Sequence, residues 1–96
     1  MDFEKDTAVN KYIESRHLKD HNDNPSGGTT VGKGITIAWQ HGPLGRGSER
    51  REPNGAFVEG VIEAAKDRIE FYQLGKFACD DNAEAIEHLE LAMKAL

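Results

Sequence analysis

The sequence predicts an α+β domain in which a small β-hairpin or single strand packs on an antiparallel two-helix hairpin. Two patterns carry this prediction. Apolar residues recur at helical spacing in two segments after residue 54, and residues 34–41 alternate apolar and polar side chains. The length adds a third observation, because a chain of 96 residues buries only a modest fraction of its surface. The first helical segment is apolar on more than one face, so we expect a homo-oligomer.

The first helix is predicted from Asn54 to about Leu74. Asn54 follows Pro53 and is expected to act as the N-cap, and Gly75 is expected to stop the helix. The apolar residues form a stripe and a second row beside it: Val58, Ile62, Ala65, Ile69 and Tyr72, then Phe57, Val61, Ala64 and Phe71.

A second helix is predicted over the last residues, with its apolar stripe formed by Ile86, Leu89, Met93 and Leu96. Asp81 and Glu84 have the spacing of a capping box, with Asp in place of Ser or Thr. The short link between the helices, residues 75–80, makes them antiparallel neighbours.

Residues 34–41 are predicted to form a strand whose apolar side, formed by Ile35, Ile37 and Trp39, packs on the helical pair. Residues 29–31 are a weaker candidate for a paired strand. Residues 27–34 nearly spell a phosphate-binding loop, but a strand follows where that motif needs a helix, so we expect a flexible loop there. We therefore divide the chain into a domain of residues 34–96 and a variable part, residues 1–33.

The variable part is predicted to be a mobile arm or short helix followed by a loop. Ala8, Val9, Tyr12, Ile13 and Arg16 would line one weakly apolar helical face. His17 and His21 have the spacing of a metal-binding pair on a helix, but no third ligand is implied. We interpret them as solvated and expect no metal.

Charge excludes some partners and favours others. The net charge of −5 disfavours binding to a DNA or RNA polymer. Residues 25–55 alone are basic, with four basic and two acidic side chains, a net of +2. Guanidinium groups of Arg50 and Arg51 in this Gly-rich stretch suit a phosphate. The alternative is an ordinary exposed loop in which Glu49 and Glu52 neutralise two arginines.

No catalytic constellation or cofactor motif is visible, so we do not expect an enzyme. The single cysteine, Cys79, excludes an internal disulfide and fits a reducing compartment. No apolar run suits a signal peptide or a membrane span, so we expect a protein of the cytoplasm without membrane contact.

Three segments, WQHGPLG, EPNGAFVEGVIEAAKDRIEFYQ and KFACDDNAEAIEHLELAMKAL, resemble phage and prophage proteins that share the hairpin domain of the anti-CBASS and Thoeris anti-defence sponges. The resemblance covers about residues 35–96. It implies a binding protein of the host bacterial cytoplasm that sequesters cyclic dinucleotides, cyclic trinucleotides or cyclised ADP-ribose derivatives. It also implies dimers that build hexamers, with pockets between protomers.

The resemblance places ligand contacts at Phe71 and Tyr72 and at Asn82. The chemistry of a cyclic nucleotide adds further residues, because bases stack on aromatic or guanidinium faces and phosphates bind cations. The added ligand-binding residues are Trp39, Arg50, Arg51, Arg68 and Lys76. Each has an alternative: the aromatic residues form core, Asn82 caps a helix, and Arg68 pairs with an acidic neighbour.

In the relatives the second helix continues into an Arg-rich tail, whereas this sequence stops at Leu96. Either the chain is truncated or the central arginines hold the phosphates. The alternative function is a phage structural or protein-interaction module that docks through its helical hairpin. An enzyme that degrades the signal is disfavoured because no nucleophile, base or metal set is present.

Overall fold

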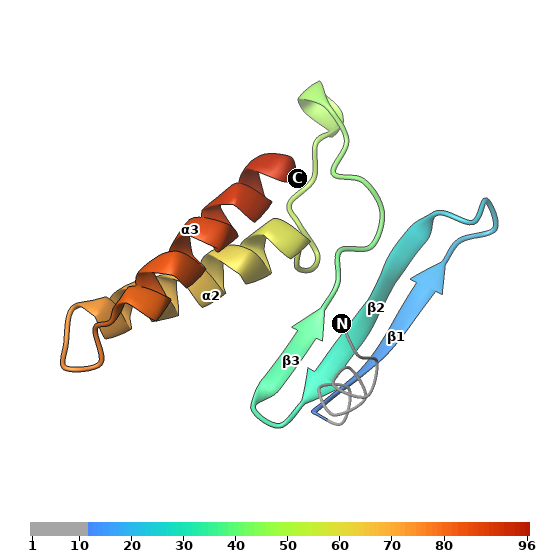
Figure 1. The fold of residues 1–96 in the computed structure, drawn as a ribbon. Helices are drawn as coiled ribbons and strands as arrows, with labels where there is room; N and C mark the ends of the chain where they lie inside the picture. Colours follow the sequence, from blue (N-terminus) through green and yellow to red (C-terminus); the bar gives the residue numbers. More distant parts are fainter. Residues whose placement is uncertain (1–11) are drawn as a thin grey trace. The chain divides into compact units, whose positions relative to one another are not determined.

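The computed structural model describes residues 12–96 and shows three strands and two long helices (Figure 1). The elements are, in chain order, β1 (Ile13–Lys19), β2 (Pro25–Gly32), β3 (Ile35–Ala38), a 3-10 turn η1 (Gly47–Glu49), α2 (Val58–Gln73) and α3 (Asp80–Ala95). The α+β class is confirmed. The chain forms two compact units, one that ends at Ala56 and one that spans Phe57–Leu96.

The first unit is built on an antiparallel sheet with the strand order β1-β2-β3. Ser15 pairs with Thr30, and Thr30 pairs with Ile37. Because side chains alternate between the two faces of a sheet, this register puts Ile13, Ile35 and Ile37 on one face, around Thr30. The strand predicted over residues 34–41 is confirmed for residues 35–38, and Trp39 forms only an isolated bridge. Packing of its apolar side on the helical pair stays a prediction.

The helix or mobile arm expected before residue 24 is wrong for residues 13–19, which form β1. The helical face was weak, and pairing with β2 satisfies the backbone instead. Ala8 and Val9 of that expected face lie outside the described residues. His17 is therefore in a strand and His21 in a turn, and residues 12–96 contain no cluster of three potential metal ligands.

The flexible loop expected at residues 27–34 is also wrong, because residues 27–32 belong to β2, the central strand. Its glycines have a packing role. At Gly28, where φ is +124°, an added Cβ would collide with the carbonyl oxygen of Arg16, and at Gly32 it would collide with that of Tyr12. The glycines that favoured a loop by composition instead allow β1 to approach β2 closely.

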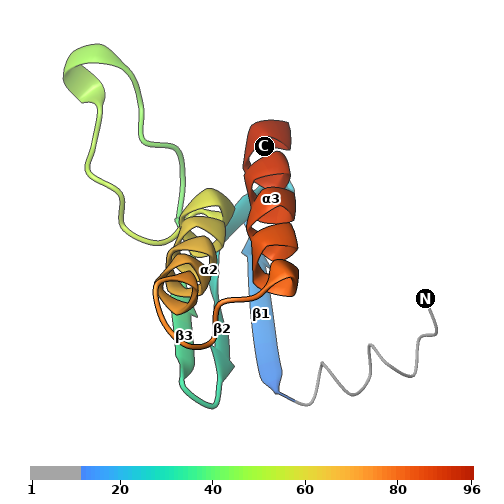
Figure 2. The same ribbon diagram turned by 60° about the vertical axis from the view of Figure 1, so that its left-hand side comes forward.

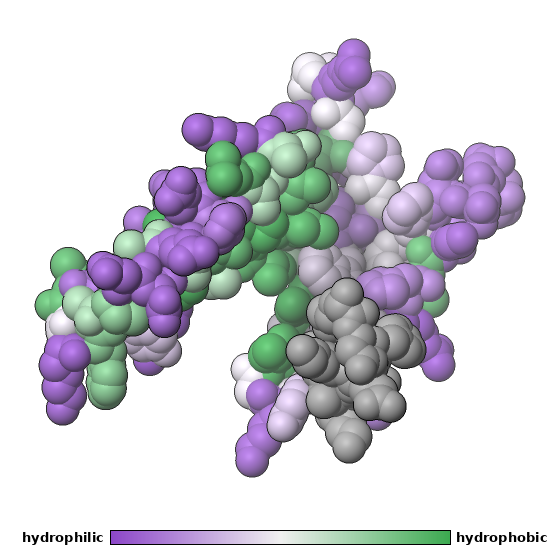
Figure 3. Space-filling model, in the orientation of Figure 1, coloured by the Kyte–Doolittle hydropathy of each residue, from purple (hydrophilic) through white to green (hydrophobic). Residues whose placement is uncertain are grey.

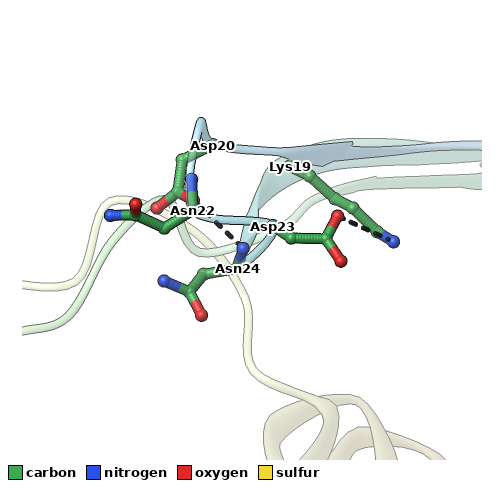
Figure 4. Close-up of polar contacts among 5 residues, drawn as sticks. All are labelled: Lys19, Asp20, Asn22, Asp23 and Asn24. Carbon is green, nitrogen blue, oxygen red and sulfur yellow. Dashed lines mark hydrogen bonds and ion pairs between the residues drawn. The ribbon is translucent and has the colours of Figure 1, made fainter.

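A polar turn joins β1 to β2 (Figure 4). The Asp20 carboxylate accepts hydrogen bonds from the backbone N–H groups of Asn22 at 2.8 Å and Asn24 at 3.0 Å. Asp23 has φ of 67°, in the left-handed region, and its carboxylate lies 3.3 Å from the Lys19 ammonium. The N–H of Asn24 is the main reason that the pKa of Asp20 is lowered.

The second unit is a helical hairpin in which α2 and α3 lie side by side and antiparallel (Figures 1 and 2). Lys66 links them, since its ammonium lies 3.4 Å from Glu90 on α3 and 3.9 Å from Glu70 on α2. The stop at Gly75 is confirmed, because α2 ends at Gln73 and the Gly75 N–H bonds the Tyr72 carbonyl at 3.1 Å.

Both predicted N-caps are wrong. α2 begins at Val58 with Phe57 as its N-cap. The side chain of Asn54 bonds instead to the backbone of His41. α3 begins two residues earlier than the capping-box pattern requires, with Cys79 as its N-cap and no side-chain cap. Asp80 and Asp81 lie in its first turn, where carboxylates favour the positive end of the helix dipole.

Residues 12–96 contain no fully buried apolar side chain, and Thr30 is the one buried residue among them, at 7 % exposure. Apolar side chains gather on the exposed surface of the hairpin (Figure 3). Large exposed apolar residues occur in both units: Tyr12, Leu18, Val31, Ile35, Phe57, Val58, Phe71, Tyr72, Leu74, Phe77, Leu91 and Leu96. Among residues 12–96, no helix has both the length and the apolar character needed to cross a bilayer.

Candidate functional site

The sequence-predicted ligand residues fall into two groups, one in each compact unit. We name residues 40–54 the arginine loop and residues 73–82 the hairpin turn. The arginine loop carries Arg50 and Arg51, and Trp39 directly precedes it. Lys76 and Asn82 belong to the hairpin turn, and the last turns of α2 lead into it with Arg68, Phe71 and Tyr72.

The arginine loop is pinned at its base. Trp39 and Ala56 form a parallel bridge, and the Gln40 N–H donates to the Ala56 carbonyl at 2.9 Å. Asn54 closes the loop just above this bridge. Its Oδ1 accepts from the His41 N–H at 2.8 Å, its Nδ2 donates to the His41 carbonyl at 2.9 Å, and its N–H donates to Gln40 Oε1 at 3.0 Å. These bonds explain why Asn54 does not cap α2.

The pinned loop borders a hollow of about 740 Å³ that is open to solvent. Gly42, Gly45 and Gly47 give the loop its curvature, with φ values of 79°, 86° and 58°. The Arg51 N–H crosses the loop to the Leu44 carbonyl at 2.7 Å. The residues that line the hollow are mostly polar: Gln40, His41, Gly42, Pro43, Leu44, Gly45, Glu49, Arg51, Glu52 and Asn54.

The guanidinium groups of the arginine loop are exposed. Within the described part of the chain, no carboxylate lies within 4.0 Å of a charged nitrogen of Arg46, Arg50 or Arg51. The neutralisation of these arginines by direct pairing with Glu49 and Glu52 is thus not formed. Their charged nitrogens remain available to an anion.

Trp39 belongs to the sheet. Its indole N–H donates to Thr30 Oγ1 at 2.8 Å, and the same hydroxyl is hydrogen-bonded to Ser15 Oγ at 2.8 Å. The indole is half-buried. These contacts give Trp39 a structural role in the first unit, and its role as a stacking surface for a base stays a prediction.

Arg68, Phe71 and Tyr72 form an exposed cluster on α2, which we name the aromatic platform. The guanidinium carbon of Arg68 lies 5.1 Å from the centre of the Phe71 ring and 5.3 Å from that of Tyr72. Arg68 Nε also donates to Tyr72 Oη at 3.3 Å. Phe71 is 59 % exposed and Tyr72 is 37 % exposed, so neither is core within the chain. Among residues 12–96, Arg68 forms no ion pair with an acidic neighbour.

Asn82 is part of a hydrogen-bond network that shapes the hairpin turn. Its Nδ2 donates to Gln73 Oε1 at 3.1 Å and to the Phe77 carbonyl at 3.0 Å. The side-chain amide of Gln73 in turn bonds to both the N–H and the carbonyl of Cys79. Asn82 therefore does not cap α3. Gln73 was not identified from the sequence. Its position was the available signal, because it is a polar residue at the end of a helix, directly before a short turn.

The rest of the hairpin turn is open. Lys76 lies with its ammonium 5.7 Å from the centre of the Phe77 ring. Phe77 is 68 % exposed and Leu74 is 87 % exposed. The aromatic platform suits a flat base, and the cations of Lys76 and the arginine loop suit phosphates.

The described residues thus present exposed aromatic and cationic side chains on a helical hairpin and on an arginine-bearing loop. Residues 33–96, two thirds of the chain, match the family model of the Acb2/Tad1 hairpin domain, and the chain belongs to this family. Proteins of the family are anti-CBASS and anti-Thoeris sponges, which bind cyclic nucleotide signals of bacterial defence. No curated protein matches the chain.

Proposed function

We propose that this protein is a phage anti-defence sponge that sequesters cyclic dinucleotides, cyclic trinucleotides or cyclised ADP-ribose derivatives in the host bacterial cytoplasm without cleaving them. The observation that carries the proposal is the exposed aromatic platform on α2, in a chain that belongs to the Acb2/Tad1 family and in which hydrogen bonds order Asn82. Tight stoichiometric binding is sufficient for such a function, because it lowers the free signal without turnover.

The aromatic platform supplies the affinity for a base. Stacking of one base on an aromatic ring contributes roughly 1–3 kcal/mol. Phe71 and Tyr72 are tilted, with ring centres 6.2 Å apart and an angle of 56° between their planes. Arg68 already lies against both rings, so its guanidinium plane offers a further stacking surface next to them.

The phosphates of the ligand require cations. Arg50, Arg51 and Lys76 are exposed, and no carboxylate among residues 12–96 lies within 4.0 Å of their charged nitrogens. Guanidinium groups bind phosphate oxygens through two parallel hydrogen bonds, which gives them geometric selectivity as well as attraction. Trp39 is the least favoured of the proposed ligand residues, since its indole N–H is committed to Thr30.

Association of copies is part of the proposal. No apolar side chain among residues 12–96 is fully buried, although the hairpin carries many large ones. A folded protein without a core of its own is stabilised when another copy covers its apolar faces. We propose a homo-oligomer, a dimer or hexamer, in which copies combine their platforms and arginine loops.

The test is a binding panel with recovery of the ligand. Purified protein is mixed with cyclic di-AMP, cyclic tri-AMP and cyclic ADP-ribose, with linear AMP as the control, and thermal unfolding is recorded. A ligand at 100 times its dissociation constant stabilises the folded state by about 2.7 kcal/mol. Mass spectrometry of the denatured complex should then recover the ligand intact. Cleaved ligand would show an enzyme, and no stabilisation by any cyclic compound would refute the sponge.

A second candidate function is a protein-interaction module that docks through the hairpin. It is favoured by one observation, the exposure of Leu74 and Phe77 at the hairpin turn. Leu74→Ser and Phe77→Ser would separate the two functions. A docking module should lose binding to its protein partner in these variants and bind no cyclic nucleotide even as wild type, whereas a sponge should bind a cyclic nucleotide as wild type.

A further inference from the structure

The two side-chain amides of the hairpin turn have a fixed orientation. Gln73 Oε1 accepts from the Cys79 N–H at 2.9 Å, and Gln73 Nε2 donates to the Cys79 carbonyl at 3.1 Å. A backbone N–H only donates and a carbonyl only accepts. The Gln73 amide therefore cannot be turned over without losing both bonds.

The orientation of Gln73 determines that of Asn82. Gln73 presents an oxygen to Asn82, and the Phe77 carbonyl presents a second one, so the Asn82 group facing them must be its NH₂, at 3.1 Å and 3.0 Å. Both N–H donors of Asn82 are consumed in this way. Its Oδ1 receives no hydrogen bond from residues 12–96 and is not buried.

We infer that Asn82 contacts a ligand through Oδ1, only as a hydrogen-bond acceptor, and that Gln73 is the positioning residue that enforces this role. The inference rests on the proposed function and deepens it. The group that Asn82 recognises is then a hydrogen-bond donor of a cyclic nucleotide, either an exocyclic amino group of a base or a ribose hydroxyl. A phosphate oxygen is excluded from this contact, because two acceptors repel each other.

The same geometry predicts what happens without Gln73. Gln73→Ala removes one of the two oxygens that hold the Asn82 NH₂ and also releases the backbone of Cys79, so the Asn82 amide keeps only the bond to the Phe77 carbonyl and is no longer held in one orientation. The preference for a donor group on the ligand should then be lost. A role confined to stability would lower affinity for all ligands equally and leave this preference unchanged.

The experiment measures selectivity by calorimetry. The probes are cyclic di-AMP and cyclic tri-AMP, each with two analogues: hypoxanthine in place of adenine, which replaces the amino donor by an oxygen, and 2′-deoxyribose, which removes the hydroxyl. One of the two analogues should bind the wild-type protein roughly tenfold to hundredfold more weakly than its parent, as expected when a polar group loses its partner. Which analogue is weakened identifies the donor.

Variants complete the test. In Gln73→Ala the weakened analogue should bind within about threefold of its parent. Gln73→Glu keeps an acceptor for Asn82 but loses the donor to the Cys79 carbonyl, so it should retain more of the selectivity in a less stable protein. Wild-type protein that binds both analogues as tightly as the parents overturns the acceptor role. Selectivity that survives in Gln73→Ala overturns the positioning role.

Failure of the proposed function is distinguished by a measurement without ligand. In NMR spectra of the free protein, the side-chain NH₂ protons of Asn82 and Gln73 should exchange slowly with water, and Gln73→Ala should accelerate exchange at Asn82. Fast exchange at both amides in the wild type overturns the fixed orientation of Gln73 and Asn82. A wild-type protein with slow exchange that binds none of the probes overturns the proposed function, and the acceptor role with it, while the fixed orientation of the two amides stands.

Discussion

The replacement of Thr30 by Val tests the one buried polar contact of the sheet. Thr30 Oγ1 accepts the indole N–H of Trp39 at 2.8 Å and shares a bond of 2.8 Å with Ser15. Val has nearly the same shape but no hydroxyl. The Ser15 hydroxyl is exposed and turns to water, whereas the half-buried indole N–H loses its acceptor. An unsatisfied buried donor costs about 1–3 kcal/mol, and because the indole is only half-buried we expect ~1–2 kcal/mol.

Urea unfolding measures this loss. Trp39 is the only tryptophan, so its fluorescence reports on the environment of the very side chain concerned. With a denaturant slope of about 1–3 kcal/mol per molar urea, the midpoint should fall by roughly 0.3–2 M. Thr29→Val is the matched control, on the opposite face of the same strand and exposed, and should change stability by less than about 0.5 kcal/mol. Equal midpoints for the two variants, at one protein concentration, would refute the reasoning.

Three further predictions concern other parts of the chain. Asn54→Ala should release the base of the arginine loop, seen as faster amide hydrogen exchange over residues 40–54, with α2 unchanged. Gly28→Ala should destabilise by more than about 2 kcal/mol in urea, because its Cβ meets the Arg16 carbonyl, whereas Gly34→Ala meets no atom and is limited to the strain of its φ of 80°. The pKa of Asp20 is lower in the folded state, so its stabilising contribution is complete above the unfolded value of about 3.9 and is lost as pH falls through the folded value. Asp20→Asn should therefore be less sensitive than wild type to a drop from pH 5 to pH 2.5 in urea midpoint.

Periodicity was sufficient to predict the helical hairpin and the strand over residues 35–38, because the apolar residues of one helix or strand face recur at a fixed spacing along the sequence. It was not sufficient for β1. That strand carries mostly polar side chains, and what specifies it is the pairing partner β2, whose glycines allow the close approach. Glycine is ambiguous in a sequence, since it marks both flexible loops and tightly packed strands.

The polar side chains show a second reason for error. Asn54 has the position of a helix cap but bonds to His41, thirteen residues away. Asp81 has capping-box spacing but lies inside α3, because Gln73 holds the backbone at Cys79 and moves the start of the helix. An amide side chain can bond to any backbone group within reach, and spacing along the chain does not reveal which one.

For the candidate site, the family resemblance named Phe71 and Tyr72 and residue chemistry added the arginines, and the role of these residues in binding stays a prediction. The platform is present as a cluster, and the arginines lie in a loop with a hollow of about 740 Å³. What spacing did not predict is the direction of Asn82. That direction depends on Gln73, which carries no charge or ring and belongs to no ligand-binding motif.

The parallel bridge between Trp39 and Ala56 has an evolutionary consequence. It joins the two ends of the arginine loop, so residues can be inserted or deleted between them without a change in the path of the chain on either side. Doubling the length of such a closed loop costs only about 0.6 kcal/mol in chain entropy. The size and charge of the segment can therefore vary without a change in the strand and the bridge that hold it.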